Sequence, residues 1–317
     1  MKVIMGTRNK FLFIVLSVLA LLVIFGFALP QGARTLLIQI MSFSIFAMGY
    51  DISLGFTDQC SLGHSVFFGT GAYVFVLSLL HFHSGIFYAI ALCFIVGVGV
   101  SLAIGVIAVR LSQAYFVIVT AVFCSIFHLF AINMTWLTGG DDGLSVSLPP
   151  ITFGSVSISI YDPLVNYFFV LFFLVVTYVI LRKITRAPLG RVFLSIKENE
   201  KKAEFLGYNV FKYKLIAFVI SGAFAALGGG LYAMSIRYAS ADFYSLYWSI
   251  LPIVWCLIGG LGTLVGPCLG VAIMAVFQYY VSAWWTYYLI IFGIVILVIL
   301  RVSRKGIVGY FMNKGLR

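Results

Sequence analysis

Long uncharged apolar runs, separated by short polar connections, occupy most of the chain. Many of them approach the ~20 residues that an α-helix needs to cross a bilayer core. Apolar length and flanking charge predict seven spans: Phe11–Leu29, Leu36–Leu54, Ser65–Leu80, Gly85–Val109, Tyr115–Met134, Leu164–Leu181 and Leu215–Ile236. The first run exceeds the ~7–15 residues of a signal-peptide core, so we interpret it as a retained span. Trp248–Leu300, interrupted by Pro252 and Pro267, is long enough for three more spans.

These runs predict an all-α, polytopic helical membrane protein with about 8–10 transmembrane helices, the lower number applying if C-terminal segments are re-entrant. We expect one transmembrane domain, 1–317, with a first set of spans (11–181), a polar loop (182–214) and a second set of spans (215–301). Thr135–Asp162 interrupts the apolar pattern with several glycines and two prolines. Apolar and polar residues alternate through 156–160, which predicts a short β-hairpin on the surface.

The segment Arg182–Lys214 is the only long polar stretch of the chain. It carries 12 of the 29 formal charges (20 basic and 9 acidic residues) in 33 of the 317 residues. Within it, apolar residues recur at helical spacing, with charged residues on the opposite side: Val192, Ile196, Ala203, Leu206 and Val210. Pro188 favours a helix that begins shortly after it, and Gly207 favours a helix end. We therefore predict one amphipathic helix, Arg191–Leu206.

Two surfaces suit such a helix. It can lie on anionic lipid, or it can dock a soluble protein subunit. Glu198, Glu200 and Glu204 are unfavourable against an anionic membrane, so we favour docking of a soluble protein.

Composition and charge narrow the class of protein. Hydrophobic residues make up 63% of the chain and charged residues 9%, against roughly 25% charged in a globular protein. The net charge of +11 sits at the ends of apolar runs, which excludes a nucleic-acid-binding patch and indicates membrane topology. Ten spans place the N-terminus, the polar loop and the C-terminal tail on one side of the membrane. Among the basic residues, only Arg34 and Arg237 then face the other side. The positive-inside rule then places both termini and the polar loop in the cytoplasm.

Small residues recur every fourth position at three places, typical of closely packed membrane helices. The three sets are Gly97, Ser101 and Gly105; Ser221, Ala225 and Gly229; and Gly262, Gly266 and Gly270. We expect each set to share one helix face. Two glycine-rich passages, Ser61–Ala72 and Leu257–Pro267, further predict irregular backbone at membrane depth, which is tolerated where it is buried in protein or lines a cavity. One passage in each half is the pattern of an internal repeat around a central pathway.

Motifs for covalent or energy-converting chemistry are absent from the sequence. It contains no phosphate-binding G-x-x-x-x-G-K-[ST], and no catalytic residues, metal ligands or cofactor are expected. His64, His128, Asp51 and Asp58 are the candidates for a proton relay. They are few for an ion-coupled carrier, the main alternative function. For His64 two interpretations remain open: a pathway or packing-switch residue, or a hydrogen-bonded histidine at a helix start.

Four motifs carry a resemblance to a known family. They are Ser61-Leu62-Gly63-His64 with Gly69-x-Gly71-Ala72-Tyr73; Leu137-Thr138-Gly139-Gly140-x-x-Gly143-Leu144; Ile196-Lys197-Glu198-Asn199-Glu200 with Ala203-Glu204-x-x-Gly207; and Gly259-Gly260-x-Gly262-Thr263-x-x-Gly266-Pro267. In this order, from about Leu36 to Arg301, the chain resembles the permease subunits of branched-chain amino-acid ABC importers. It departs from the family pattern at Lys201 and Lys202, where small or apolar residues are usual.

The resemblance implies a transport subunit, not an enzyme, in the inner membrane of a bacterium. Implied partners are a second homologous permease subunit, two ABC ATPase subunits and an extracytoplasmic substrate-binding protein. Substrates of the family include branched-chain and other amino acids, urea and short amides. The implied coupling-helix residues are Arg191, Ile196, Glu198, Glu200, Ala203, Glu204, Leu206 and Gly207. Candidate pathway or gating residues are Gly63, His64, Gly69, Gly71, Gly259, Gly260, Gly262, Thr263, Gly266 and Pro267.

An outer loop, Thr138–Gly143, is where we expect the binding protein or the incoming substrate to arrive. Its members are Thr138, Gly139, Gly140, Asp141, Asp142 and Gly143. The glycines allow tight turns with positive φ. The two aspartates either orient a donor or solvate the loop, and the sequence does not separate these roles.

Overall fold

The structure is a computed structural model that describes residues 17, 20–82, 85–153, 156–284, 293 and 306–307. Its long helices are α2 (Gln31–Thr57), α3 (His64–Phe82), α4 (Ile86–Ala108), α5 (Gln113–Asn133), α7 (Pro163–Arg186), α10 (Val210–Ile236), α11 (Leu246–Gly259) and α12 (Val265–Trp284). Short helices are α6 (Thr135–Thr138), η1 (Gly140–Asp142), α8 (Pro188–Glu198), α9 (Glu200–Phe205) and η2 (Ala241–Tyr244). The protein is therefore all-α, as predicted.

Six helices in the described part of the chain are long and apolar enough to cross a membrane: α2, α3, α4, α5, α7 and α10. Each coincides with a predicted span, although α2, α7 and α10 extend beyond the predicted ends. The apolar helices α11 and α12 follow where three spans were expected. Residues 11–16 and 18–19 of the predicted first span, most of the chain after residue 284 and the charged residues of both basic termini lie outside the described residues. The predicted sidedness of the termini therefore remains a prediction.

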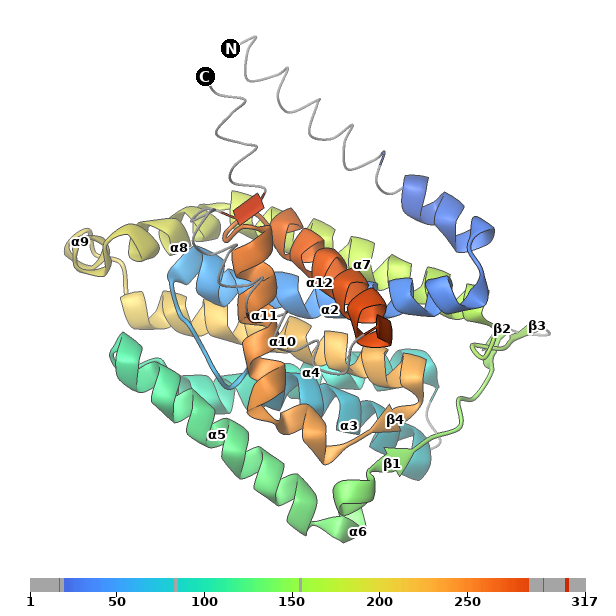
Figure 1. The fold of residues 1–317 in the computed structure, drawn as a ribbon. Helices are drawn as coiled ribbons and strands as arrows, with labels where there is room; N and C mark the ends of the chain where they lie inside the picture. The colour runs from blue at the N-terminus through green and yellow to red at the C-terminus, as the bar shows by residue number, and fades with distance from the viewer. Residues whose placement is uncertain are drawn as a thin grey trace.

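Helix α10 is the centre of the bundle, with α2 on one side and α3 and α4 on the other (Figure 1). Small residues make this packing close. A side chain at Gly71 would run into the backbone of Ala226, and one at Gly229 into the backbone of Phe68. Gly222 likewise faces Ser101 of α4. In lipid, such close contact gives helices the dispersion energy that the hydrophobic effect does not supply.

The small-residue sets on α4 and α10 therefore do mark packed faces. The prediction that the third set shares one helix face is wrong, because Gly262 does not belong to a helix. It lies in the turn between α11 and α12 with φ +73°, whereas Gly266 and Gly270 lie in α12. The irregular backbone expected for Ser61–Ala72 is also wrong from His64 onward, since α3 begins there.

The segment between α5 and α7 contains the predicted hairpin. Strands β2 (Ile151–Phe153) and β3 (Val156–Ile158) pair antiparallel. Strand β1 (Leu144–Ser145) pairs with β4 (Tyr238–Ala239), which directly follows α10. This second pairing fixes the α5–α7 segment to one end of the central helix.

A single methyl group at the centre of the bundle tests this packing. We expect Gly71→Ala to lower the thermal unfolding midpoint of the detergent-purified protein by several degrees, because overpacking a buried contact costs about 1–3 kcal/mol. The matched control is Gly99→Ala in α4, where a Cβ meets nothing within 4 Å. Equal midpoints for the two variants, measured by size-exclusion fluorescence after heating, would contradict the close packing of α3 on α10.

Candidate functional site

The polar segment folds into two helices, α8 and α9, instead of the single predicted helix Arg191–Leu206. Pro188 takes the first position of α8, where its missing N–H costs nothing. The break comes at Asn199, whose backbone is extended and whose side chain accepts from the Lys202 N–H at 2.9 Å. Asparagine caps a new helix well, so α9 starts there with a different direction.

One face of this α8–α9 segment is buried against the bundle, as the amphipathic pattern predicts. Val192, Ile196 and Ala203 pack together beside Val210. The charged candidates are exposed: Arg191, Glu198, Glu200 and Glu204. Leu206 corrects the prediction, because it is 75% exposed and does not belong to the buried face.

The tip of α9 presents two large apolar side chains to solvent. Phe205 is 90% exposed, and Leu206 follows it. Gly207 follows the helix end, as predicted, and has the left-handed backbone conformation, with φ +88°. Figure 1 shows α9 at one extremity of the molecule. The tip therefore has the shape of a small apolar knob surrounded by charge.

A charged side chain ties α8 to the bundle. The Lys197 ammonium donates to the Gly55 carbonyl, near the end of α2, at 2.6 Å. This carbonyl belongs to the last turn of α2, whose final carbonyl groups have no partner within the helix. A cation is favoured there.

One turn earlier in α2, the Asp51 carboxylate holds the glycine-rich turn between α11 and α12. It accepts from the Gly262 N–H at 2.8 Å and from the Leu264 N–H at 3.1 Å. Asp51 is fully buried. Gly260, Gly262 and Leu264 all have positive φ, which directs their neighbouring N–H groups toward one anion. Asp51 is thus the anchor of this turn.

The turn is also closed internally. The Thr263 hydroxyl donates to the Gly260 carbonyl at 2.8 Å and accepts from the Gly266 N–H at 2.9 Å. Gly259 and Gly266 lie so close that no Cβ fits between them. These members of the predicted pathway set therefore shape a compact turn, with Pro267 in the first turn of α12.

An ion pair ties α9 to the central helix. Lys214 donates to Glu200 at 2.5 Å, and Lys214 is only 18% exposed. Because α10 begins at Val210 and continues unbroken to Ile236, this ion pair joins α9 to a membrane-spanning rod. The two short helices are therefore attached to two different spans.

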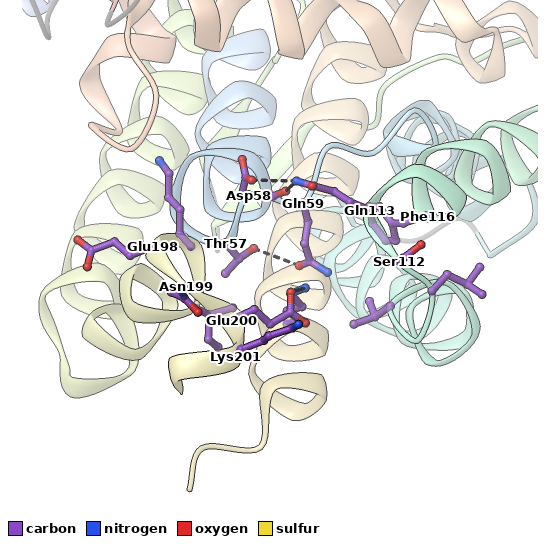
Figure 2. A pocket seen from close by; sticks show the side chains of 15 residues that line it. Thr57, Asp58, Gln59, Ser112, Gln113, Phe116, Glu198, Asn199, Glu200 and Lys201 are labelled. Atoms are coloured by element: carbon purple, nitrogen blue, oxygen red, sulfur yellow. Dashed lines mark hydrogen bonds and ion pairs between the residues drawn. The ribbon is translucent and has the colours of Figure 1, made fainter. Parts of the chain in front are cut away.

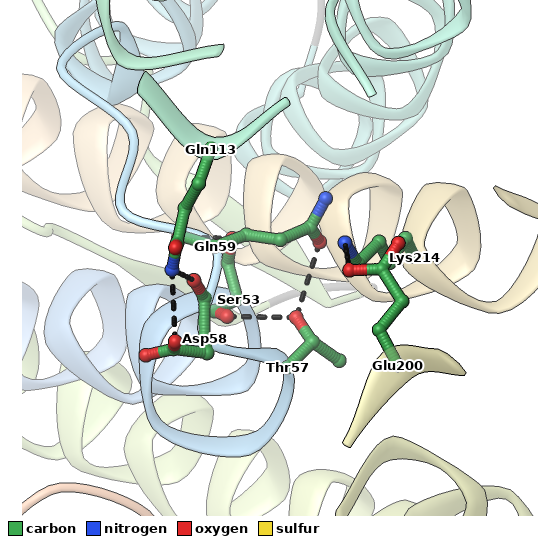
Figure 3. A network of polar contacts seen from close by, with 7 residues as sticks. All are labelled: Ser53, Thr57, Asp58, Gln59, Gln113, Glu200 and Lys214. Carbon is green, nitrogen blue, oxygen red and sulfur yellow. Dashed lines mark hydrogen bonds and ion pairs between the residues drawn. The ribbon is translucent and has the colours of Figure 1, made fainter. Parts of the chain in front are cut away.

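A polar pocket of about 380 Å³ lies beneath the α8–α9 segment. The α8–α9 junction, the end of α2, the α4–α5 connection and Lys214 of α10 line it (Figure 2). Gln113 of α5 donates to the Asp58 carboxylate at 2.8 Å, and Thr57 donates to the Gln59 side chain at 3.1 Å (Figure 3). The Glu200–Lys214 pair borders the same network.

The remaining candidates lie apart from this pocket. Gly63, just before α3, packs against Thr120, and Gly69 and Gly71 of α3 pack against Tyr244 and Ala226. His64 is fully buried, and its Nε2 lies 2.7 Å from the Ser221 hydroxyl of α10. His128 contacts the Ala241 carbonyl. The four proton-relay candidates are thus each engaged separately.

The outer loop forms the tight turns expected of it. Gly139, Gly140 and Gly143 all have positive φ. The Tyr238 hydroxyl donates to the Asp142 carbonyl at 2.7 Å, which holds the loop against the end of α10. The side chains of Asp141 and Asp142 are exposed. Among described residues, no group of three or more His, Cys, Asp or Glu side chains is placed to hold a metal ion.

Comparison with known proteins identifies the family. The model of the permease component of branched-chain amino acid transport systems matches residues 32–300. The chain belongs to this family.

Curated relatives of this permease include two proteins named LivM, high-affinity branched-chain amino acid transport system permease proteins. That of Salmonella typhimurium is 26% identical over 86% of this chain and 68% of its own length. That of Escherichia coli is 27% identical over 81% of this chain and 65% of its own length. A guanosine ABC transporter permease of Bacillus subtilis is 41% identical, over 16% of the chain. No solved structure matches.

Sequence reasoning missed the roles of three residues in this permease. Asp51 was a proton-relay candidate, Lys197 one of many basic residues, and Phe205 was not singled out. The available signal was a carboxylate inside an apolar span, which must find hydrogen-bond donors when it is buried.

The Asp51 anchor generates a direct test. An amide side chain in Asp51→Asn keeps the shape but can accept at one oxygen only, and its NH2 group opposes a backbone donor. Since a hydrogen bond to a charged group contributes about 1.5–3 kcal/mol, we expect amide hydrogen exchange at residues 260–264 to accelerate roughly tenfold or more. Asp141→Asn, at an exposed acid, is the control. Unchanged exchange in this turn would show that Asp51 does not hold it.

Proposed function

We propose that this permease is the membrane subunit of an ATP-driven importer for branched-chain or other hydrophobic amino acids. Its partners are a second homologous permease, two ABC ATPase subunits and an extracytoplasmic binding protein, and it lies in the inner membrane of a bacterium. The family match over residues 32–300 and the names of the LivM relatives support this proposal. The chain spans about two thirds of the length of those relatives.

The α8–α9 segment is the surface proposed to contact an ATPase subunit. The observation that carries this is the exposed pair Phe205 and Leu206 at the molecular extremity. Large apolar side chains that a charged rim surrounds are typical anchors of protein interfaces. The glutamates of the segment argue against insertion into anionic lipid, because like charges repel.

Movement of the docked ATPase would reach the spans through the two ties. Displacement of α8 acts on Gly55 of α2, beside the Asp51-anchored turn, through Lys197. Displacement of α9 acts on α10 through the Glu200–Lys214 pair. Both contacts are made with membrane-spanning helices, α2 and α10. A force on α8 or α9 would therefore be transmitted to the helices that must move during alternating access.

Reconstitution tests the proposal. The chain is purified gently, soluble ATPases and a binding protein that accompany it are identified, and the complex is placed in liposomes with internal ATP. We expect uptake of leucine, isoleucine and valine that depends on ATP hydrolysis. Uptake by the chain alone, driven by an ion gradient, would overturn the proposal in favour of a stand-alone carrier. ATP-driven uptake of urea, short amides or guanosine instead would correct the substrate.

The docking knob has its own test. We expect the double variant Phe205→Ser, Leu206→Ser to retain its fold but to co-purify with the ATPase roughly tenfold less, because loss of a buried interface anchor costs about 2 kcal/mol or more. ATP-driven uptake should fall in parallel. Phe82→Ser, at a 73% exposed aromatic at the end of α3, is the control. Full ATPase retention by the double variant would contradict docking at this tip.

A further inference from the structure

A second cavity, of about 350 Å³, lies in the half of the bundle opposite α8–α9. It is bounded by the first turns of α2, the end of α10, the start of α11 and the later turns of α12. Its volume lies within the range of roughly 300–1,000 Å³ that small-molecule sites occupy. None of its lining residues carries a formal charge.

Aromatic rings form much of the cavity wall. Phe43 stacks on Trp255 with ring centroids 5.4 Å apart, and it lies 5.8 Å from Trp248. The Trp248 indole N–H donates to the Asp242 carboxylate at 3.0 Å. The polar edge of that ring is thus engaged, and the ring also stacks on Phe68 with centroids 5.2 Å apart, so what it offers to the cavity is apolar surface. Such a wall suits a branched or aromatic side chain.

Two amide side chains line the same cavity from different spans, Gln39 of α2 and Gln278 of α12. Both are partly buried, and within the described part of the chain neither amide has a hydrogen-bond partner. Amide groups in an apolar span are unfavourable unless they find partners. Their convergence on one cavity therefore indicates a polar ligand group, with both donors and acceptors.

Helix α11 contributes a backbone acceptor to this part of the bundle. Pro252 lies inside α11 and has no N–H. The carbonyl four residues earlier, that of Trp248, consequently lacks its helical donor. Trp248 itself lines the cavity, so the wall combines apolar rings, two amides and a residue whose carbonyl lacks its helical donor.

We infer that this cavity is a transient binding site for the transported amino acid, taken as a zwitterion with an apolar side chain. The rings accept the side chain. The Gln39 and Gln278 amides donate to the carboxylate, and their oxygens, with the Trp248 carbonyl, accept from the ammonium group. The absence of a fixed charge in the lining suits a site that must also release its ligand. The inference rests on the proposed function and assigns its substrate site.

Size selectivity tests the site. Ala275 lines the cavity from α12, so Ala275→Phe should narrow it. In reconstituted complexes we expect the ratio of leucine to alanine uptake to fall roughly tenfold relative to the unmodified chain, the scale that a pocket achieves for small apolar differences. Ile273→Phe is the matched control, because Ile273 lies on the same helix and is 41% exposed outside the cavity. Equal losses for both amino acids, or equal effects of both variants, would overturn the inference and indicate a lipid-filled groove.

Direct binding separates this inference from the proposed function. Titration of the purified complex with leucine should quench tryptophan fluorescence, and the double variant Gln39→Leu, Gln278→Leu should lose the quench. A quench without ATP-driven uptake by the unmodified complex would leave the site standing and remove the proposed function. Normal uptake, with the quench and the leucine preference unchanged in every variant, would remove the site and leave the function standing.

Discussion

The structure depends on how closely its helices approach α10. Lipid offers no hydrophobic drive for helix association, so the bundle relies on dispersion between surfaces that fit without gaps. Gly71 and Gly229 permit backbone contacts, and Gly222 a contact with the Ser101 side chain, that a single methyl group would prevent. The other packing choices follow from this, because α2, α3 and α4 are all positioned by the same central helix.

Buried polar contacts then connect the bundle to its less regular parts. In a low-dielectric interior a hydrogen bond is stronger than in water, so a carboxylate that accepts from several backbone N–H groups can fix the shape of a loop. Asp51 does so for the turn between α11 and α12, and Lys197 brings α8 to the same end of α2. The candidate site is thus a junction of helix ends, and its geometry is set by backbone groups that lack helical partners.

Local patterns predicted the helices well because apolar length and flanking charge act within one segment. The same patterns gave wrong predictions where the structure of a segment is determined by a competing local interaction or by a residue far away in the sequence. Asn199 starts a new helix by capping it, which leaves Leu206 beyond the helix end and exposed. The Asp51–Gly262 contact joins positions 211 residues apart. No periodicity in either segment indicates that pairing, so the role of Asp51 became visible only in three dimensions.

Helix α10 also joins the two ends of the protein. Its 27 residues form a rod about 40 Å long. One end carries the Lys214 pair with Glu200, and the other continues into β4, whose Tyr238 holds the outer loop at Asp142. If both ends respond to one equilibrium of this rod, thermodynamic linkage applies. A ligand at the outer loop that strengthens binding at α9 must itself be bound more tightly, by the same factor, when α9 is occupied.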